Sequence, residues 1–329
     1  MKKRIFLICT AMLLALGHSY AQTVLTDVQS DSGSVASLDR CTTIDAQITG
    51  KCKKQLAAGL KNFQGSYGQL AVLDAQTGQL KAWVALAMKD GKVVDALLQK
   101  QSCSTFPLVR VVPLLELLAS EGKGALSDSI DVDNGVYPVN DTLIVRDHNW
   151  RVGGYDRMTV LEAFTKHSNV ASFKLLERYL GKDEALKTWQ GFIGDGKVSN
   201  AMEQAMMFNS FCSVKPFRSQ SLIGDSLVTY PSLRTDVYEV CQDVLIKMNE
   251  GDGLQAKYAP LGVKLAGCYS HVMITKTGTR EFSFYGAFPA DSPRYAIGVF
   301  IDTDYHGPLS NASLAKAVVN PLAEILMKL

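Results

Sequence analysis

Three short stretches of the sequence contain residues that can carry out or support chemistry. "CSTFP" holds Ser104 in front of a predicted helix, "KHSNV" holds His167 and Asn169, and "TKTGT" holds the run from Lys276 to Thr279. A serine hydroxyl is a weak nucleophile until a neighbouring base removes its proton. An imidazole, with an ordinary pKa of about 6.5, is such a base. The third stretch offers a lysine and a hydroxyl on one strand, together with a glycine that lets the backbone of a ligand approach closely.

Each stretch also has a purely structural interpretation. Ser104 at a helix start is a preferred N-cap, because its hydroxyl accepts a hydrogen bond from an orphan backbone N–H. A lone "KTG" is an ordinary strand end, and a lone histidine before a helix is usually a partly exposed surface group. Position alone does not separate these interpretations, so the wider sequence has to decide.

The order of the three stretches, with a helical region between each pair, resembles the penicillin-binding protein transpeptidase family and its serine β-lactamase relatives. The three elements of that family are S-x-x-K, S-D-N and K-T-G. The flanking sequence supports the resemblance: "GQLAVLDAQTGQLKAWVAL" is similar to the family's first hairpin, and "MTVLEAF" precedes the second element. "FSFYGAFPADSPRYAIGVFID" is similar to the hairpin that follows the third, so the resemblance covers about residues 65–329.

The resemblance implies a ligand class and a role for each residue. The ligands would be the D-Ala-D-Ala end of peptidoglycan stem peptides and their β-lactam mimics, bound in part by charge-assisted hydrogen bonds to a carboxylate. Ser104 would attack, and backbone N–H groups that include its own would stabilise the oxyanion. Acyl transfer of this kind needs neither a metal nor an organic cofactor. The residues that would hold the substrate are Asn169, Lys276, Thr277, Gly278 and Thr279.

Two departures from the family pattern leave the activity open. Pro107 stands where the family has lysine, and His167 stands where it has serine. Proline is tolerated in the first turn of a helix, so this change spares the fold and removes the base. Arg110 does not replace the lysine, because a guanidinium stays protonated.

Two hypotheses follow from these departures. In the first, His167 takes the proton of Ser104 and makes the chain a serine acyltransferase of the peptidoglycan transpeptidase class, with Asp147 as a distant candidate to orient the ring. In the second, the chain is a catalytically inactive, transpeptidase-like module that binds wall peptide or a partner protein. The lost lysine favours inactivity, whereas the retained Ser104 and "KTGT" favour activity.

Sequence patterns also predict the elements that position these residues. "GQLAVLDAQTGQLKAWVAL" indicates a hairpin with a glycine turn, and Thr159 with Glu162 forms a capping-box pattern. The chain begins and ends with strands and is helical between them, which predicts an α+β fold. We expect one mainly antiparallel sheet, built from both chain ends and packed with helices, plus an all-helical subdomain. Predicted helices cover about Ile44–Leu60, Leu108–Ser120, Ala201–Phe211, Thr235–Met248 and Asn311–Leu329; predicted strands include "HVMITKTGT", "EFSFYGAFPA" and "RYAIGVFIDT".

Residues 1–21 have a basic start, a short apolar run and small residues at the end, which is typical of a signal peptide. We therefore expect export across the cytoplasmic membrane and a periplasmic protein, tethered if the signal is not cleaved. Residues 22–60 are predicted as an N-terminal arm or linker, beginning with a polar, aperiodic stretch. Residues 61–329 form the predicted transpeptidase-like domain.

Charge and cysteine content narrow the partners. Loss of the three basic residues in the signal changes the net charge from +2 to about −1, which argues against a nucleic-acid partner. Six cysteines remain, with no C-x-x-C pair and no histidine at ligand spacing, so the sequence offers no zinc site. Cys41 and Cys52 are the nearest candidates for a local disulfide, and buried free thiols are the alternative.

Overall fold

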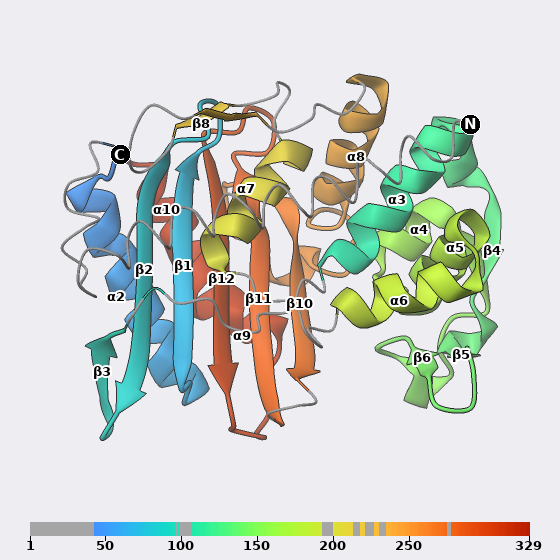
Figure 1. Cartoon of the computed structure of the whole chain (residues 1–329), viewed down its shortest axis with the longest axis horizontal. Helices are drawn as coiled ribbons and strands as arrows, with labels where there is room; N and C mark the ends of the chain where they lie inside the picture. Colours follow the sequence, from blue (N-terminus) through green and yellow to red (C-terminus); the bar gives the residue numbers. More distant parts are fainter. Residues whose placement is uncertain are drawn as a thin grey trace.

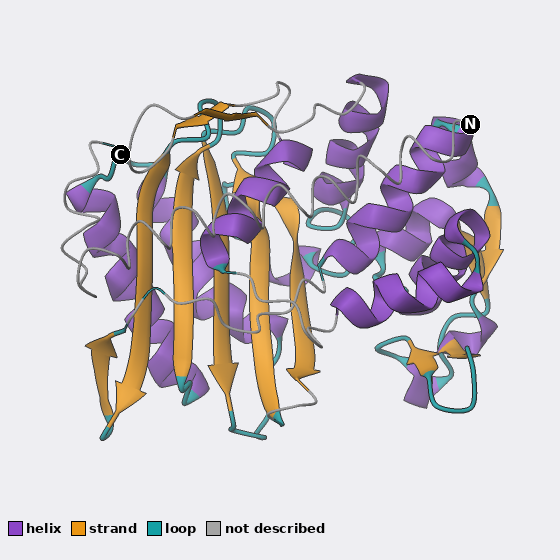
Figure 2. Cartoon of the chain, in the orientation of Figure 1, coloured by secondary structure: helices purple, strands orange, loops and turns teal. Residues whose placement is uncertain are grey.

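The computed structural model describes residues 43–96, 98, 107–192, 200–212, 218–220, 227–229, 235–274 and 278–329. Figure 1 shows a broad sheet on one side of the molecule and a group of helices on the other. Figure 2 shows the same division by type of secondary structure. The predicted signal peptide and arm up to residue 42, together with Ser104, Lys276 and Thr277, lie outside the described residues.

The sheet is built from both ends of the described chain. Its central seam pairs β1 with β12, from Tyr67 opposite Asp302 to Asp74 opposite Tyr295. All five strand pairings are antiparallel, so the predicted α+β class and antiparallel sheet are confirmed. In sheet order the strands are β10 (Ala266–Ile274), β11 (Thr279–Phe288), β12 (Tyr295–Thr303), β1 (Tyr67–Asp74), β2 (Leu80–Lys89) and β3 (Lys92–Asp95).

The predicted hairpin connects β1 to β2. The Asp74 side chain accepts hydrogen bonds from the backbone N–H groups of Gln76 and Thr77, at 2.9 and 2.8 Å. Gly78 has φ of +72°, a left-handed conformation that glycine adopts without steric penalty. Aspartate and glycine therefore set the turn that brings β2 alongside β1.

One face of the sheet is covered by α2 (Ala46–Phe63) and by the C-terminal helices. Asp45 caps α2 by accepting from the backbone N–H groups of Gln47 and Ile48. The C-terminal elements are α9 (Asn311–Leu314), a π-helical turn (Ala315–Val319) and α10 (Asn320–Leu326). Residues of α2 that are buried in this core include Cys52, Leu56, Leu60 and Phe63.

The predicted start of the domain at residue 61 lies inside α2. It divides α2, whose buried residues pack with the C-terminal helices and the sheet, so residues from about Asp45 onward belong to the domain. Cys52 is a free thiol in this core. This finding goes against the favoured bridge to Cys41, which is itself outside the described residues.

Helix α7 (Ala201–Cys212) covers the opposite face and crosses β1, β11 and β12; Figure 1 shows it in front of these strands. Gly298 of β12 makes this approach feasible, because a Cβ atom there would collide with the backbone carbonyl of Ala201. A small residue in β12 thus fixes how closely α7 lies on the sheet.

The second half of the molecule is mainly helical. The predicted capping box is confirmed: Thr159 Oγ1 accepts from the Glu162 backbone N–H, and the Glu162 carboxylate accepts from the Thr159 backbone N–H. The helices of this half are α3 (Leu108–Glu121), α4 (Val160–Thr165), α5 (Asn169–Leu180), α6 (Lys182–Phe192) and α8 (Thr235–Lys247).

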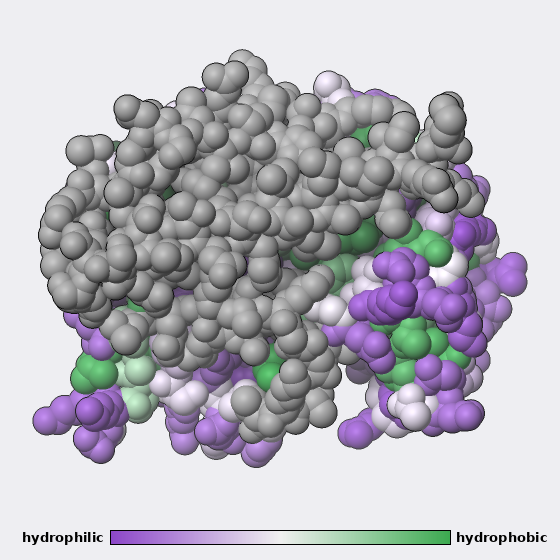
Figure 3. Space-filling view, in the orientation of Figure 1, coloured by the Kyte–Doolittle hydropathy of each residue, from purple (hydrophilic) through white to green (hydrophobic). Residues whose placement is uncertain are grey.

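Two short strand pairs accompany the helices of this half. The pairs are β4 (Ser129–Asp131) with β7 (Arg157–Thr159) and β5 (Val136–Pro138) with β6 (Ile144–Arg146); β8 (Arg218–Gln220) pairs with β9 (Leu227–Thr229) elsewhere. Figure 3 shows mostly hydrophilic side chains on the visible outer surface of the helical half, with hydrophobic patches between them. Within the described ranges, every helix is too short or too polar to cross a bilayer.

Candidate functional site

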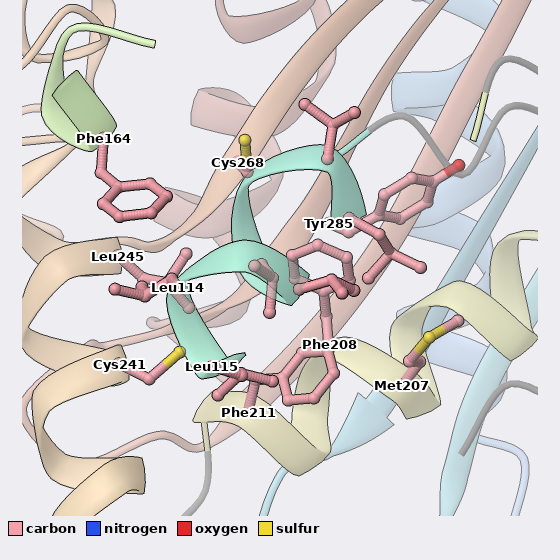
Figure 4. Packing of buried hydrophobic residues seen from close by; sticks show 14 of the residues in the cluster. Leu114, Leu115, Phe164, Met207, Phe208, Phe211, Cys241, Leu245, Cys268 and Tyr285 are labelled. Carbon is pink, nitrogen blue, oxygen red and sulfur yellow. The ribbon is translucent and has the colours of Figure 1, made fainter. Parts of the chain in front are cut away.

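Helix α3 lies between the two halves, and its start defines the candidate site. Pro107 is the buried N-cap residue, and the helix begins at Leu108. Ser104 is therefore not the N-cap of α3, and its own position is outside the described residues. Figure 4 shows α3 packed among side chains from several elements. The labelled neighbours include Phe164 of α4, Phe208 and Phe211 of α7, Cys241 and Leu245 of α8, Cys268 of β10 and Tyr285 of β11.

Arg110, in the first turn of α3, connects three elements. It is only 6% exposed. Its Nη2 donates to Oδ1 of Asn169 on α5 at 3.3 Å, and its Nη1 donates to Sγ of Cys268 on β10 at 3.8 Å. A guanidinium remains protonated in proteins, so a permanent positive charge lies where α3, α5 and β10 meet.

Asn169 is the first residue of α5, and both ends of its side-chain amide are used within the protein. Oδ1 accepts from Arg110, and Nδ2 donates to the backbone carbonyl of Arg146 at 2.9 Å. Ser168 caps the helix by accepting from the Ala171 backbone N–H. The structure thus places Asn169 at the site, where its amide already has protein partners.

Asp147 supports the start of α5. This buried carboxylate accepts from Ser168 Oγ at 2.9 Å and from the Val170 backbone N–H at 3.0 Å. A negative charge at a helix N-terminus is favourable, because the helix dipole is positive there. The bonds of Asp147 go to α5 and not to the ring of His167, so the structure gives no support to Asp147 as the residue that orients that ring.

His167 lies in the turn between α4 and α5. Its φ of +59° is left-handed, and its backbone N–H donates to the Phe164 carbonyl at 3.1 Å. The side chain is 4% exposed, and its buried Nε2 has no hydrogen-bond partner among the residues that the structure describes. Burial, followed by the charges of Arg110 and His148, holds the pKa of His167 well below its usual range. The imidazole is therefore neutral and resists taking up a proton.

The "KTGT" stretch is only partly described, and its described residues do not join this site. β10 ends at Ile274, β11 begins at Thr279, and these two residues are paired. Gly278, with φ of +70°, donates its backbone N–H to the Ile274 carbonyl at 2.8 Å. Gly278 therefore belongs to the connection between the strands, which corrects the prediction of one continuous strand. Ile274 lies six positions after Cys268, about 20 Å along a strand.

Sequence reasoning missed two groups at or near the site. Cys268 is buried, and burial raises the pKa of its thiol, which the Arg110 charge partly offsets. Ser270 of β10 and Ser283 of β11 are directly opposite each other and buried, and neither hydroxyl has a hydrogen-bond partner among the described residues. Cys268 and Ser270 are two residues apart and therefore share a face of the sheet. This alternation in "GCYSHV" is the signal that would have indicated them.

Metal ligands do not gather in the described part of the chain. No group of three or more histidine, cysteine, aspartate or glutamate side chains there could hold an ion. The described site instead combines a buried cation, a neutral imidazole, a carboxamide and a thiol. These groups suit ligand binding better than proton transfer. The guanidinium is a permanent donor, the imidazole is a weak base, and the carboxamide and the thiol are bonded to Arg110.

The comparisons with known proteins concern the fold. No protein-family model matches the chain, and no curated protein matches its sequence. A solved structure described as a peptidoglycan glycosyltransferase from Burkholderia ambifaria aligns with a TM-score of 0.65 at 15% identity, over 87% of this chain and 96% of that one. The transpeptidase domain of penicillin-binding protein 3 from Burkholderia pseudomallei aligns with a TM-score of 0.65 at 16% identity, over 88% and 96%.

A third solved structure gives the same result. The transpeptidase domain of the FtsI4 D,D-transpeptidase from Legionella pneumophila aligns with a TM-score of 0.58 at 14% identity, over 88% of this chain and 98% of that one. Identities this low establish the fold and not the activity. The chain therefore has the fold of a penicillin-binding protein transpeptidase domain, as the order of its three motifs indicates.

Proposed function

We propose that this chain is an exported protein that uses a transpeptidase fold for binding and does not form an acyl-serine. The observation that carries this proposal is the buried guanidinium of Arg110, which bonds to Asn169 and Cys268 at the junction of α3, α5 and β10. A guanidinium does not release its proton, so Arg110 cannot supply the base that the chemistry of this fold needs.

The position of Arg110 on α3 strengthens this inference. In S-x-x-K the lysine follows the nucleophile by three residues, which is about one helical turn. The residue that reaches Asn169 from the first turn of α3 is Arg110, and the residue three positions before it is Pro107. Pro107, which stands where the family has lysine, thus lies one turn before Arg110, the residue of α3 that contacts Asn169. Neither a prolyl ring nor a guanidinium can carry out acyl transfer.

His167 is a poor replacement for the missing base. A general base works best when its pKa lies near the operating pH. Burial and the nearby charge of Arg110 move the pKa of His167 well below its usual range, so a proton taken from a serine would be held weakly. This argues against the Ser104–His167 hypothesis. The alternative function remains acyl transfer by Ser104, for which the retained serine is the support.

The ligand class that fits this proposal is a peptide with a free carboxylate. Arg110 supplies a fixed positive charge, and guanidinium groups bind carboxylates by charge-assisted hydrogen bonds. Ser270 and Ser283 supply two buried hydroxyls on the same side of the sheet as Cys268, without partners in the described part of the chain. A peptidoglycan stem peptide ending in D-Ala-D-Ala has this chemistry, and so does the carboxyl end of a partner protein.

Two measurements test the proposal. The first is the intact mass of the protein after prolonged exposure to a penicillin at acidic, neutral and alkaline pH. We expect no added mass. A stable adduct that disappears in Ser104→Ala would overturn the proposal and establish acyl transfer.

The second measurement is calorimetric titration with a soluble stem peptide ending in D-Ala-D-Ala. We expect binding without turnover, at least ten-fold weaker in Arg110→Met, since a charge-assisted hydrogen bond contributes roughly 1.5–3 kcal/mol. The amidated peptide serves as the matched control, because it lacks the carboxylate. Equal binding of the acid and the amide would exclude Arg110 as the carboxylate anchor.

A further inference from the structure

A solvent-exposed tryptophan lies between two arginines on the helical half of the molecule. Trp150 begins the short helical turn Trp150–Val152, which follows β6. The guanidinium carbons of Arg146 and Arg151 lie 5.0 and 5.2 Å from the centre of the Trp150 ring. Val152 and Ile144 beside them are 84% and 40% exposed. We call Ile144, Arg146, Trp150, Arg151 and Val152 the Arg–Trp patch.

Two observations show that this patch is not an ordinary surface. The other tryptophans of the chain, Trp83 and Trp189, are buried, whereas Trp150 is 37% exposed. Other basic residues of the same half are paired with acidic ones, as Arg157 is with Asp131 and Lys174 with Asp133. Neither arginine of the patch forms an ion pair within the described part of the chain. The patch therefore presents apolar area together with positive charge that no described neighbour neutralises.

The backbone holds the Arg–Trp patch in a defined shape. The Arg146 carbonyl accepts from Asn169 Nδ2, and the next residue, Asp147, is anchored to the start of α5. After the patch, Gly154 has φ of +65° and lies so close to the Asn134 carbonyl that a Cβ atom would collide with it. A surface that is ordered before binding loses less entropy when a partner arrives.

We propose that the Arg–Trp patch is a docking site for an acidic, extended segment of a partner protein. The two guanidinium carbons both lie about 5 Å from one ring centre, so they are at most about 10 Å apart. Alternate residues of an extended chain project to the same side about 7 Å apart, which lets two carboxylates reach both arginines. Stacking on the indole orients the planar guanidinium groups, and such groups bind carboxylates in a bidentate manner.

The types of residue in the patch also favour a protein partner. Tryptophan and arginine are enriched among the residues that dominate protein–protein binding energy, and the apolar Val152 and Ile144 offer contacts to the aliphatic parts of the acidic side chains. The contacts that define this surface are separate from those of Arg110 with Cys268. The proposal therefore holds or fails independently of acylation at Ser104.

Trp150 itself is the reporter for the test, because it is the exposed indole of the three in the chain. The full-length protein is titrated with a synthetic peptide of alternating glutamate and leucine, and with its glutamine–leucine counterpart as the matched control. We expect the glutamate peptide to change the Trp150 emission, with an affinity that falls as salt is added, and the glutamine peptide to bind at least ten-fold more weakly. Equal binding of the two, or no binding of the glutamate peptide at about millimolar concentration, would refute the docking site.

Charge-matched variants locate the binding. Arg146→Gln and Arg151→Gln should each weaken binding of the glutamate peptide about five-fold, which is the upper range for an exposed ion pair. Arg157→Gln removes the same charge from the same half, outside the patch, and should leave the affinity unchanged. An equal loss of affinity in Arg157→Gln would show that the peptide responds to net charge and not to the patch. Sedimentation with anionic lipid vesicles tests a membrane surface as the partner. If the protein binds the vesicles and not the glutamate peptide, the patch belongs to a membrane surface and the proposal is overturned.

Discussion

Arg110 of α3 donates a hydrogen bond from Nη2 to Oδ1 of Asn169, the first residue of α5, over 3.3 Å. This bond joins the two helices whose sequence motifs the family resemblance identifies. It also uses the carboxamide oxygen of Asn169, while the nitrogen is bonded to the Arg146 carbonyl. The site is thus internally connected, and any ligand that binds Asn169 through its amide must compete with Arg110 or Arg146.

The charge of Arg110 is one cause of the low pKa of His167, so removing that charge should raise it. In Arg110→Met we expect the His167 pKa to move up toward its usual range, while burial keeps it from reaching that range. The measurement is an NMR titration of the imidazole resonances, with His167→Gln to assign the signal among the five histidines. Arg157→Met is the control, and a His167 pKa that does not differ between the two variants would contradict the assignment.

Asp147 should contribute to stability through the start of α5. In Asp147→Asn the charge at the helix N-terminus is lost, and one of the donors from Ser168 and Val170 faces an NH₂ group instead of a carboxylate oxygen. We expect a loss of roughly 1–3 kcal/mol in the free energy of unfolding, measured by urea denaturation. Asp141→Asn, on an exposed residue, should change it by less than about 0.5 kcal/mol. Equal losses in the two variants would show that Asp147 acts only through net charge.

Local signals made much of the fold predictable from the sequence. The β1–β2 turn, with Asp74 and Gly78, and the capping box of Thr159 and Glu162 each depend on a few neighbouring residues, and both are present as predicted. The sheet built from both chain ends follows from strand patterns at both ends with helices between them. The packing of α2 with the C-terminal helices was harder to predict, because it depends on contacts between residues far apart in the sequence.

The site was harder to predict, because it depends on side-chain directions that a sequence pattern does not contain. Every residue of α3 from Leu108 to Leu118 is buried, so no polar face indicates which residue points toward α5. Arg110 was considered only as a base and rejected, although its role in the structure is that of a donor. The "KTG" sequence is compatible with a strand and also with a turn, because Gly278 can adopt the positive φ that it has in the structure.

Glu116 of α3 should make stability depend on pH. Burial raises its pKa to about 7. Between the ordinary glutamate pKa and this value, the unfolded chain binds fewer protons than the folded one. The free energy of unfolding is therefore highest below about pH 4.5 and falls as the pH rises through 7. Glu116→Gln should remove this dependence and raise the free energy of unfolding at pH 8 by roughly 1–2 kcal/mol, after allowance for solvent screening. Urea denaturation at about pH 4.5 and at pH 8 checks this prediction, with the exposed Glu324→Gln as control. If the free energy of unfolding depends on pH in the same way in the two variants, the prediction is contradicted.

Two glycines should respond to alanine in opposite directions. Gly298 of β12 lies directly beneath the backbone of Ala201 in α7, where a Cβ atom would collide with a carbonyl oxygen that cannot rotate away. Gly298→Ala should therefore push α7 from the sheet and lower the free energy of unfolding by roughly 1–3 kcal/mol. Gly50 is an exposed residue inside α2 with no atom within 4 Å of a Cβ position. Gly50→Ala should raise the free energy by roughly 0.5–1 kcal/mol, because alanine restricts the unfolded chain and favours the helix. Thermal and urea unfolding of the two variants provide the measurement. If Gly298→Ala stabilises the protein, the backbone of Ala201 in α7 does not lie as close to Gly298 of β12 as the structure shows.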